Sequence, residues 1–167
     1  MTANPAGVAG IRVETARDIE ATGDPGAVDR YLIDSADSGG AIAVVEHLLA
    51  PRTLAAPIHR HSREDEYSLV LAGRLGVFEE GDEVVASPGD LVFKPRGRWH
   101  TFWNAGDEPL RVLELIVPGG IEQLFRQLAE LGGEYDPKTL PQLAAGYGCD
   151  VDFESSMALV QRHKLVF

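Results

Sequence analysis

Cysteine and long apolar runs are both scarce in this chain of 167 residues. Cys149 is the single cysteine, so no internal disulfide can form, and we expect a reducing compartment and a small buried side chain here. The longest apolar stretches, such as Ala41–Val45, are far too short to span a bilayer. The first residues contain neither the basic segment nor the long apolar segment of a secretory signal. We therefore expect a cytoplasmic protein without a membrane partner.

Basic residues are also few. Fifteen Lys and Arg stand against 26 Asp and Glu, which gives a formal net charge of −11. A nucleic-acid backbone or an anionic membrane would be repelled by such a chain, so neither is an expected partner. Hydrophobic residues make up 44% and charged residues 25%, as is usual for a globular protein, and the length fits one domain.

Glycine (18 residues) and proline (10 residues) punctuate short runs of β-branched and apolar residues. We expect strands at eight of these runs: Val28–Ile33, Ala41–Leu49, Tyr67–Leu71, Leu75–Phe78, Val84–Ala86, Leu91–Lys94, His100–Asn104 and Leu110–Val117. Many short strands separated by turns are typical of a β-sandwich or barrel and not of alternating βαβ units.

The pattern changes after Pro118. Apolar residues then recur at helical spacing, at Ile121, Leu124, Phe125, Leu128 and Leu131. Asp136-Pro137 predicts the start of a second short helix that ends near Ala145, and a third is expected at Phe153–Gln161. These helices are too small to fold alone, so we interpret them as a cover packed on the β-domain.

Three of the five histidines fall in two tight clusters. A His-x-His pair on a strand, here His59 and His61, places both imidazoles on one face, where a carboxylate from the next strand can reach them. His100 follows a turn built on proline and glycine. Three imidazoles and one carboxylate suit a first-row divalent ion such as Fe, Mn, Co, Ni or Zn. An octahedral ion would keep two positions open, as a catalytic site requires.

These residues stand at the spacing of a known family. Pro57-x-His59-x-His61-(four)-Glu66-(six)-Gly73 resembles the first cupin motif. Gly89-(five)-Pro95-x-Gly97-(two)-His100-(three)-Asn104 resembles the second, and the 15-residue spacer between the motifs is similar to that of compact microbial cupins. The resemblance implies an all-β fold, the double-stranded β-helix or jelly-roll barrel, here with a short C-terminal helical extension. We divide the chain into an N-terminal arm (1–24), a cupin barrel (25–118) and a helical cover (119–167), the arm being either flexible or an added edge strand.

The resemblance also implies a metal site and a reaction. It assigns His59, His61, Glu66 and His100 as ligands of one divalent transition metal ion. The tail that begins at Val117 is similar to that of small cupins described as quercetinase-like, which implies a dioxygenase for an aromatic or enolic small molecule, with Glu66 also serving as base. A non-redox isomerase, cyclase or lyase and a binding protein without turnover are the alternatives. Cupins of this build commonly pair, so we expect a homodimer.

Strand alternation predicts a mostly apolar substrate pocket. Ser68 and Val70 share an inward face with Glu66, and Phe102 and Asn104 share one with His100; of these, Ser68, Val70 and Phe102 are assigned to the pocket. Lys94 is expected to face solvent, which assigns Leu91 and Phe93 to the interior. Such a lining suits an aromatic or enolic molecule better than a sugar phosphate. The alternative is that these side chains simply fill the barrel core.

Several nearby side chains have two interpretations. Four arginines flank the motifs: Arg60, Arg63, Arg96 and Arg98. They could attract an anionic substrate to the entrance, but we favour pairing with Glu64 and Asp65, which we expect in a solvated turn. Trp99, Trp103 and Tyr67 are expected under the helical cover or at a dimer contact. His47 and His163 match no motif and are not expected to bind metal.

Overall fold

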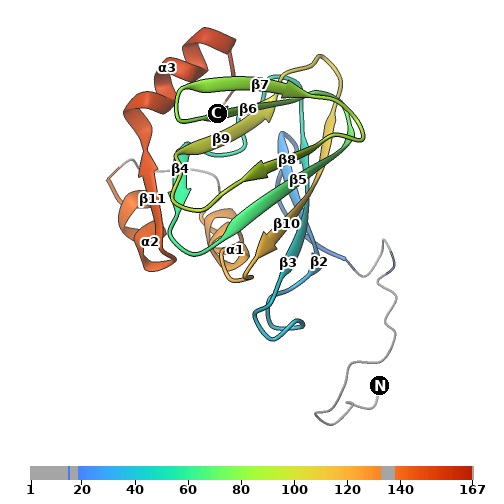
Figure 1. The fold of residues 1–167 in the computed structure, drawn as a ribbon, viewed down its shortest axis with the longest axis vertical. Coiled ribbons are helices and arrows are strands. Elements are labelled where there is room, and N and C mark those ends of the chain that lie inside the picture. Colours follow the sequence, from blue (N-terminus) through green and yellow to red (C-terminus); the bar gives the residue numbers. More distant parts are fainter. Residues whose placement is uncertain (1–14, 16–18, 133–137, 167) are drawn as a thin grey trace.

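The computed structural model describes Thr15 and residues 19–132 and 138–166. Its strands form two sheets that together build a barrel (Figure 1). One sheet has the order β1 (Glu20–Asp24), β2 (Ala27–Ile33), β3 (Ala43–Leu49), β10 (Leu110–Val117), β5 (Asp65–Ala72) and β8 (Leu91–Lys94). The other has the order β11 (Cys149–Asp152), β4 (Ile58–His61), β9 (His100–Asn104), β6 (Leu75–Glu79) and β7 (Asp82–Ala86). This arrangement confirms the double-stranded β-helix.

The barrel core lies between the two sheets. Alternation along β5 buries Glu66, Ser68 and Val70, while the residues between them are more exposed. The core cluster takes buried apolar side chains from both sheets: Leu49, Val70, Leu75, Val77, Ala86, Phe102, Leu110 and Val112. All eight expected strands are present. β1 pairs with β2 as an edge strand, whereas β11 was not among the expected strands.

Three helices follow the barrel: α1 (Glu122–Glu130), α2 (Leu140–Gly146) and α3 (Phe153–His163). The expected α2 start at Asp136-Pro137 lies outside the described residues. α3 packs over Trp103, which is 1% exposed and contacts Leu159, so the expected packing of Trp103 under the helical cover is confirmed. A Cβ at Gly76 would approach the Trp103 ring to 2.2 Å, so only glycine fits beside it. No helix in the described part of the chain has the length and apolar character needed to cross a membrane.

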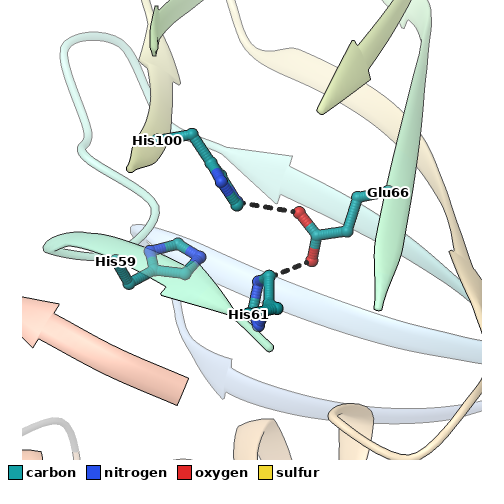
Figure 2. A group of neighbouring side chains, drawn as sticks. All are labelled: His59, His61, Glu66 and His100. Carbon is teal, nitrogen blue, oxygen red and sulfur yellow. Dashed lines mark hydrogen bonds and ion pairs between the residues drawn. The ribbon is translucent and has the colours of Figure 1, made fainter. Parts of the chain in front are cut away.

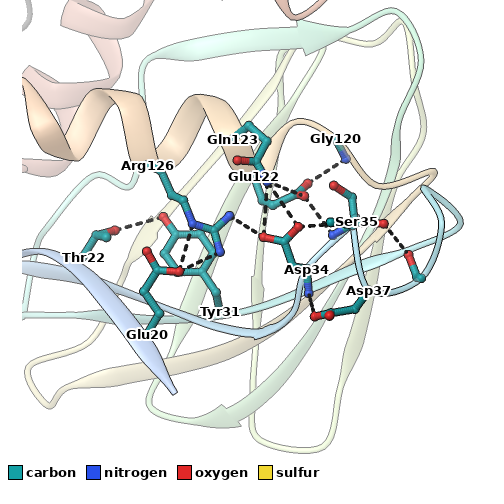
Figure 3. A network of polar contacts seen from close by, with 12 residues as sticks. Glu20, Thr22, Tyr31, Asp34, Ser35, Asp37, Gly120, Glu122, Gln123 and Arg126 are labelled. Atoms are coloured by element: carbon teal, nitrogen blue, oxygen red, sulfur yellow. Dashed lines mark hydrogen bonds and ion pairs between the residues drawn. The ribbon is translucent and has the colours of Figure 1, made fainter. Parts of the chain in front are cut away.

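Helix α1 is fastened to the first strands of the larger sheet (Figure 3). The Arg126 guanidinium lies 3.8 Å from the centre of the Tyr31 ring. It also forms ion pairs with Glu20, at 2.9 Å, and with Asp34, at 2.7 Å. These contacts, together with the apolar cluster that Leu124 shares with Tyr31, hold α1 against the first strands of the larger sheet.

Candidate metal centre and adjoining cavity

Four polar side chains from three strands converge inside the barrel (Figure 2). His59 and His61 come from β4, Glu66 from β5 and His100 from β9, and His59 lies directly opposite His100 in the β4–β9 pairing. Nε2 of His61 and Nε2 of His100 each lie 3.2 Å from a Glu66 carboxylate oxygen. One potential ligand atom from each residue lies within 4.8 Å of the others. The structure thus brings the predicted ligand set together.

Backbone carbonyls orient two of the imidazoles. The Nδ1–H groups of His59 and His100 donate hydrogen bonds to the carbonyls of Pro57, at 2.7 Å, and Arg98, at 3.0 Å. Their Nε2 lone pairs are therefore left for the centre of the cluster, as in many metal sites. Both ring nitrogens of His61 are buried, and neither has a hydrogen-bond partner in the described residues. This donor set fits a divalent transition metal ion, so the cluster could hold one.

The two imidazoles of β4 differ in protonation, and that of His59 suits a metal. Burial, followed by the neighbouring His100 and His61 rings, holds the pKa of His59 well below its usual range. The neutral imidazole is the form that binds a metal. Burial also lowers the pKa of His61, but the Glu66 carboxylate outweighs it and raises the pKa to about 10. A metal ion at this position would take the place of that proton.

A buried lysine balances the charge of the cluster. Lys94 Nζ lies 2.9 Å from Glu66 Oε2 and 3.1 Å from Glu114 Oε2, and Ser68 Oγ donates a hydrogen bond of 2.8 Å to Glu114. Burial raises the pKa of Glu66, but Lys94 and then His61 outweigh it and hold the pKa well below its usual range. Glu66 is thereby kept ionised, which suits a metal ligand better than a proton acceptor.

Lys94 corrects the predicted pocket. The expectation that it faces solvent is wrong, because the β5–β8 register sets Lys94 opposite the inward-facing Glu66. Its neighbours on the strand are consequently turned outward. Leu91 is 60% exposed and Phe93 is 51% exposed, so their assignment to the substrate pocket is wrong. Phe93 instead stacks on Tyr67, with ring centres 4.9 Å apart.

A cavity of about 210 Å³ adjoins the cluster, and His59, His61 and Glu66 form part of its lining. Apolar side chains from the barrel and from the helical cover form most of the rest: Leu49, Phe102, Ile121, Leu124, Phe125, Leu128 and Leu140. Phe102 lines the cavity as predicted, whereas Ser68 and Val70 point inward but do not contribute to its lining. Cys149, buried as expected, also lines the cavity. A mostly apolar cavity beside a polar cluster is typical of small-molecule sites.

The cavity contains a second polar pair that the sequence analysis missed. His47 and Asp29 both line it, and Nδ1 of His47 lies 2.7 Å from Asp29 Oδ1. Alternation along β3 places His47 on the same face as the buried Val45 and Leu49. That spacing is the signal that could have placed His47 inside the barrel.

The four arginines near the motifs are paired with carboxylates. Their pairs in the structure are Arg60–Asp150, Arg63–Glu64, Arg96–Asp65 and Arg98–Glu79. The favoured pairing with Glu64 and Asp65 is thus confirmed for Arg63 and Arg96, whereas Arg60 and Arg98 pair with other carboxylates. Asp65 is partly exposed, but Glu64 is 2% exposed, so its expected place in a solvated turn is wrong, and burial raises the pKa of its carboxyl. Neither residue belongs to the four-residue cluster.

Comparison with known proteins agrees with this fold. Residues 45–116 match the family described as Cupin domain, and the chain therefore carries a cupin domain. The predicted oxalate decarboxylase of Thermotoga maritima shares the fold at 22% identity, with a TM-score of 0.57 over 64% of this chain and 99% of that one. The polyketide cyclase RemF of Streptomyces resistomycificus matches at 25% identity, with a TM-score of 0.55 over 64% of this chain and 79% of that one.

A curated relative matches a shorter stretch. Oxidoreductase iacF of Pestalotiopsis fici is 44% identical over 48 residues, which is 28% of this chain and 24% of the relative. The match therefore spans about a quarter of that relative's length. The two solved structures, named as a decarboxylase and a cyclase, share this fold, so the fold alone does not identify a reaction.

Proposed function

We propose that this protein is a metal-dependent dioxygenase of the quercetinase-like kind, acting on an aromatic or enolic small molecule. The observation that carries the proposal is the three-His, one-Glu cluster at one side of a mostly apolar cavity. The match to a curated oxidoreductase supports an oxidative reaction. A redox-capable divalent ion in the cluster would supply activation of the substrate oxygen and of dioxygen.

The chain's own residues prepare this site in three ways. Lys94 keeps Glu66 ionised as a ligand, which gives less support to the additional role of Glu66 as base. The rings of Phe102 and Phe125 line the cavity and offer apolar surfaces to a planar substrate. Helix α1 supplies Leu124, Phe125 and Leu128 to the cavity and gives it an apolar wall.

Non-redox catalysis by the same cluster is the second candidate. The cyclase RemF, at 25% identity and with the same fold, favours an isomerase, cyclase or lyase, and three imidazoles with one carboxylate are equally acceptable to zinc. A binding protein without turnover would use the same cavity.

Oxygen uptake distinguishes these functions. Metal-free protein would be reloaded separately with Fe(II), Mn, Co, Ni and Zn, its metal content measured, and each sample mixed with a flavonol or a simple catechol. We expect uptake that needs both the substrate and a redox-capable metal. The His100→Ala variant should lose it, whereas His163→Ala, a histidine outside the cluster, should retain it. Confirmed loading without uptake for any metal would refute the dioxygenase, and zinc-supported turnover without oxygen would favour the second candidate.

A further inference from the structure

The cavity holds a polar pair separate from the four-residue cluster. Asp29 on β2 lies opposite His47 on β3 in the strand register, and His47 Nδ1–H donates to Asp29 Oδ1 at 2.7 Å. His47 is 6% exposed, and both residues line the cavity. Because the carboxylate engages Nδ1, Nε2 is the ring nitrogen left for a ligand, and no described residue forms a hydrogen bond with it.

Two aromatic rings flank His47. Its ring centre lies 5.4 Å from that of Phe102 on β9 and 5.9 Å from that of Phe125 on α1. Both phenylalanines line the same cavity, so a planar ligand in contact with them lies next to the imidazole. The Asp29 carboxylate fixes the orientation of the imidazole, in the way that an acidic partner orients many functional histidines.

We propose that Asp29 and His47 form a substrate-binding dyad, in which the doubly protonated His47 imidazolium, held by Asp29 through Nδ1–H, donates a hydrogen bond from Nε2–H to an anionic oxygen on an aromatic ligand. This proposal rests on the proposed function only where it identifies the natural substrate. That substrate would carry two oxygen functions on one aromatic framework, one facing the metal cluster and a phenolate or carboxylate facing His47. Binding of an aromatic carboxylate at the dyad needs no metal and can be tested separately.

Benzoate is the probe for this test. It would be titrated into metal-free protein labelled with ¹⁵N at histidine, and the imidazole signals would be followed by NMR. We expect a saturable shift of the His47 Nε2 signal. The His47→Gln variant should bind benzoate about tenfold more weakly, the loss expected for one hydrogen bond to a charged group. The matched control is His163→Gln: His163 also pairs with a carboxylate, Glu83, at 2.7 Å, but does not line the cavity.

The possible results test the proposed dyad and the proposed dioxygenase activity independently. Benzoate affinity that is unchanged in His47→Gln, or equally reduced in His163→Gln, would overturn the dyad. So would a wild-type protein without a saturable His47 shift, a result that does not depend on any variant folding. Benzoate binding at His47 without oxygen uptake would refute the dioxygenase alone. Oxygen uptake without benzoate binding would refute the dyad alone.

Discussion

At the residue scale, Lys94 supplies the positive charge that allows two carboxylates to lie buried beside the candidate metal centre. Its Nζ contacts both Glu66 and Glu114, and all three side chains are nearly inaccessible to solvent. Replacing Lys94 with Met would leave both carboxylates buried without their cation. We expect Lys94→Met to lower the free energy of unfolding of the metal-free protein by about 3–5 kcal/mol, measured by urea denaturation.

A surface pair provides the control for Lys94→Met. Arg98 contacts Glu79 at 2.7 Å, but half of the Arg98 side chain is exposed. Its replacement by Met should cost less than about 1 kcal/mol, because solvent screens the pair. Equal losses for Arg98→Met and Lys94→Met would show that the buried charge triad does not stabilise the fold.

The Asp29–His47 pair should make stability depend on pH. Burial lowers the pKa of His47, but Asp29, with a smaller contribution from Glu114, outweighs burial and Lys94, so the pKa is raised. Because the pKa of His47 is raised in the folded state, protonation of His47 stabilises the folded protein. This stabilisation is complete below the unfolded-state pKa of about 6.5 and is lost as the pH rises through the folded-state pKa. The stability lost in Asp29→Asn should therefore be largest near about pH 6 and shrink at alkaline pH. Urea denaturation across this range measures it, and a loss that grows with pH would contradict the assignment.

The cluster residues could be predicted from sequence because the motif spacing and strand alternation are local. Lys94 and His47 could not be placed in the same way. A lysine on a short strand is expected to face solvent, and its burial depends on Glu114, a distant residue whose own burial the sequence did not indicate. The orientation of His47 in the cavity depends on Asp29, its partner on the neighbouring strand.

At the scale of elements, α1 is positioned by the contacts of Arg126, whose side chain is 18% exposed. Arg126→Ala would remove the cation–π contact with Tyr31 and the ion pairs with Glu20 and Asp34. We expect amide hydrogen exchange to become faster in α1 and β1, while the barrel strands β5 and β9 remain protected. Hydrogen-exchange mass spectrometry measures this difference.

An exposed arginine tests whether the effect of Arg126 is specific. Arg52 pairs with Asp107 at 2.9 Å, but the Asp107 side chain is 88% exposed. Arg52→Ala should leave exchange in α1 unchanged. Faster exchange throughout the barrel in Arg126→Ala would instead indicate general destabilisation.

Among the elements, those with local periodicity were predictable and those that depend on distant pairing were not. The helical spacing of Leu124 and Leu128 predicted α1 correctly. β11 is a short strand that contains two aspartates. It forms by pairing with β4, where Cys149 lies opposite His61, a residue distant in sequence. No local pattern encodes such a contact.

At the scale of the whole molecule, apolar side chains gather on the outer face of one edge of the larger sheet. β8 is the edge strand of that sheet. Leu91 and Phe93 lie on it opposite Leu69 and Tyr67 of β5. Because Leu91 and Phe93 are more than half exposed, this edge face (Tyr67, Leu69, Leu91 and Phe93) is available to a partner.

We propose that a second copy of the chain covers this edge face, in agreement with the homodimer expected from the cupin resemblance. A two-fold axis would bury the same apolar face of both copies, and an edge strand is well suited to such pairing. Phe93→Glu would place a carboxylate in the interface of a protein with net charge −11, and it should yield monomers in analytical ultracentrifugation.

Val84, 55% exposed on β7 of the other sheet, is the control, and Val84→Glu should remain dimeric. A wild-type protein that sediments as a monomer at all concentrations would refute the dimer. Dissociation by both variants would locate the interface elsewhere.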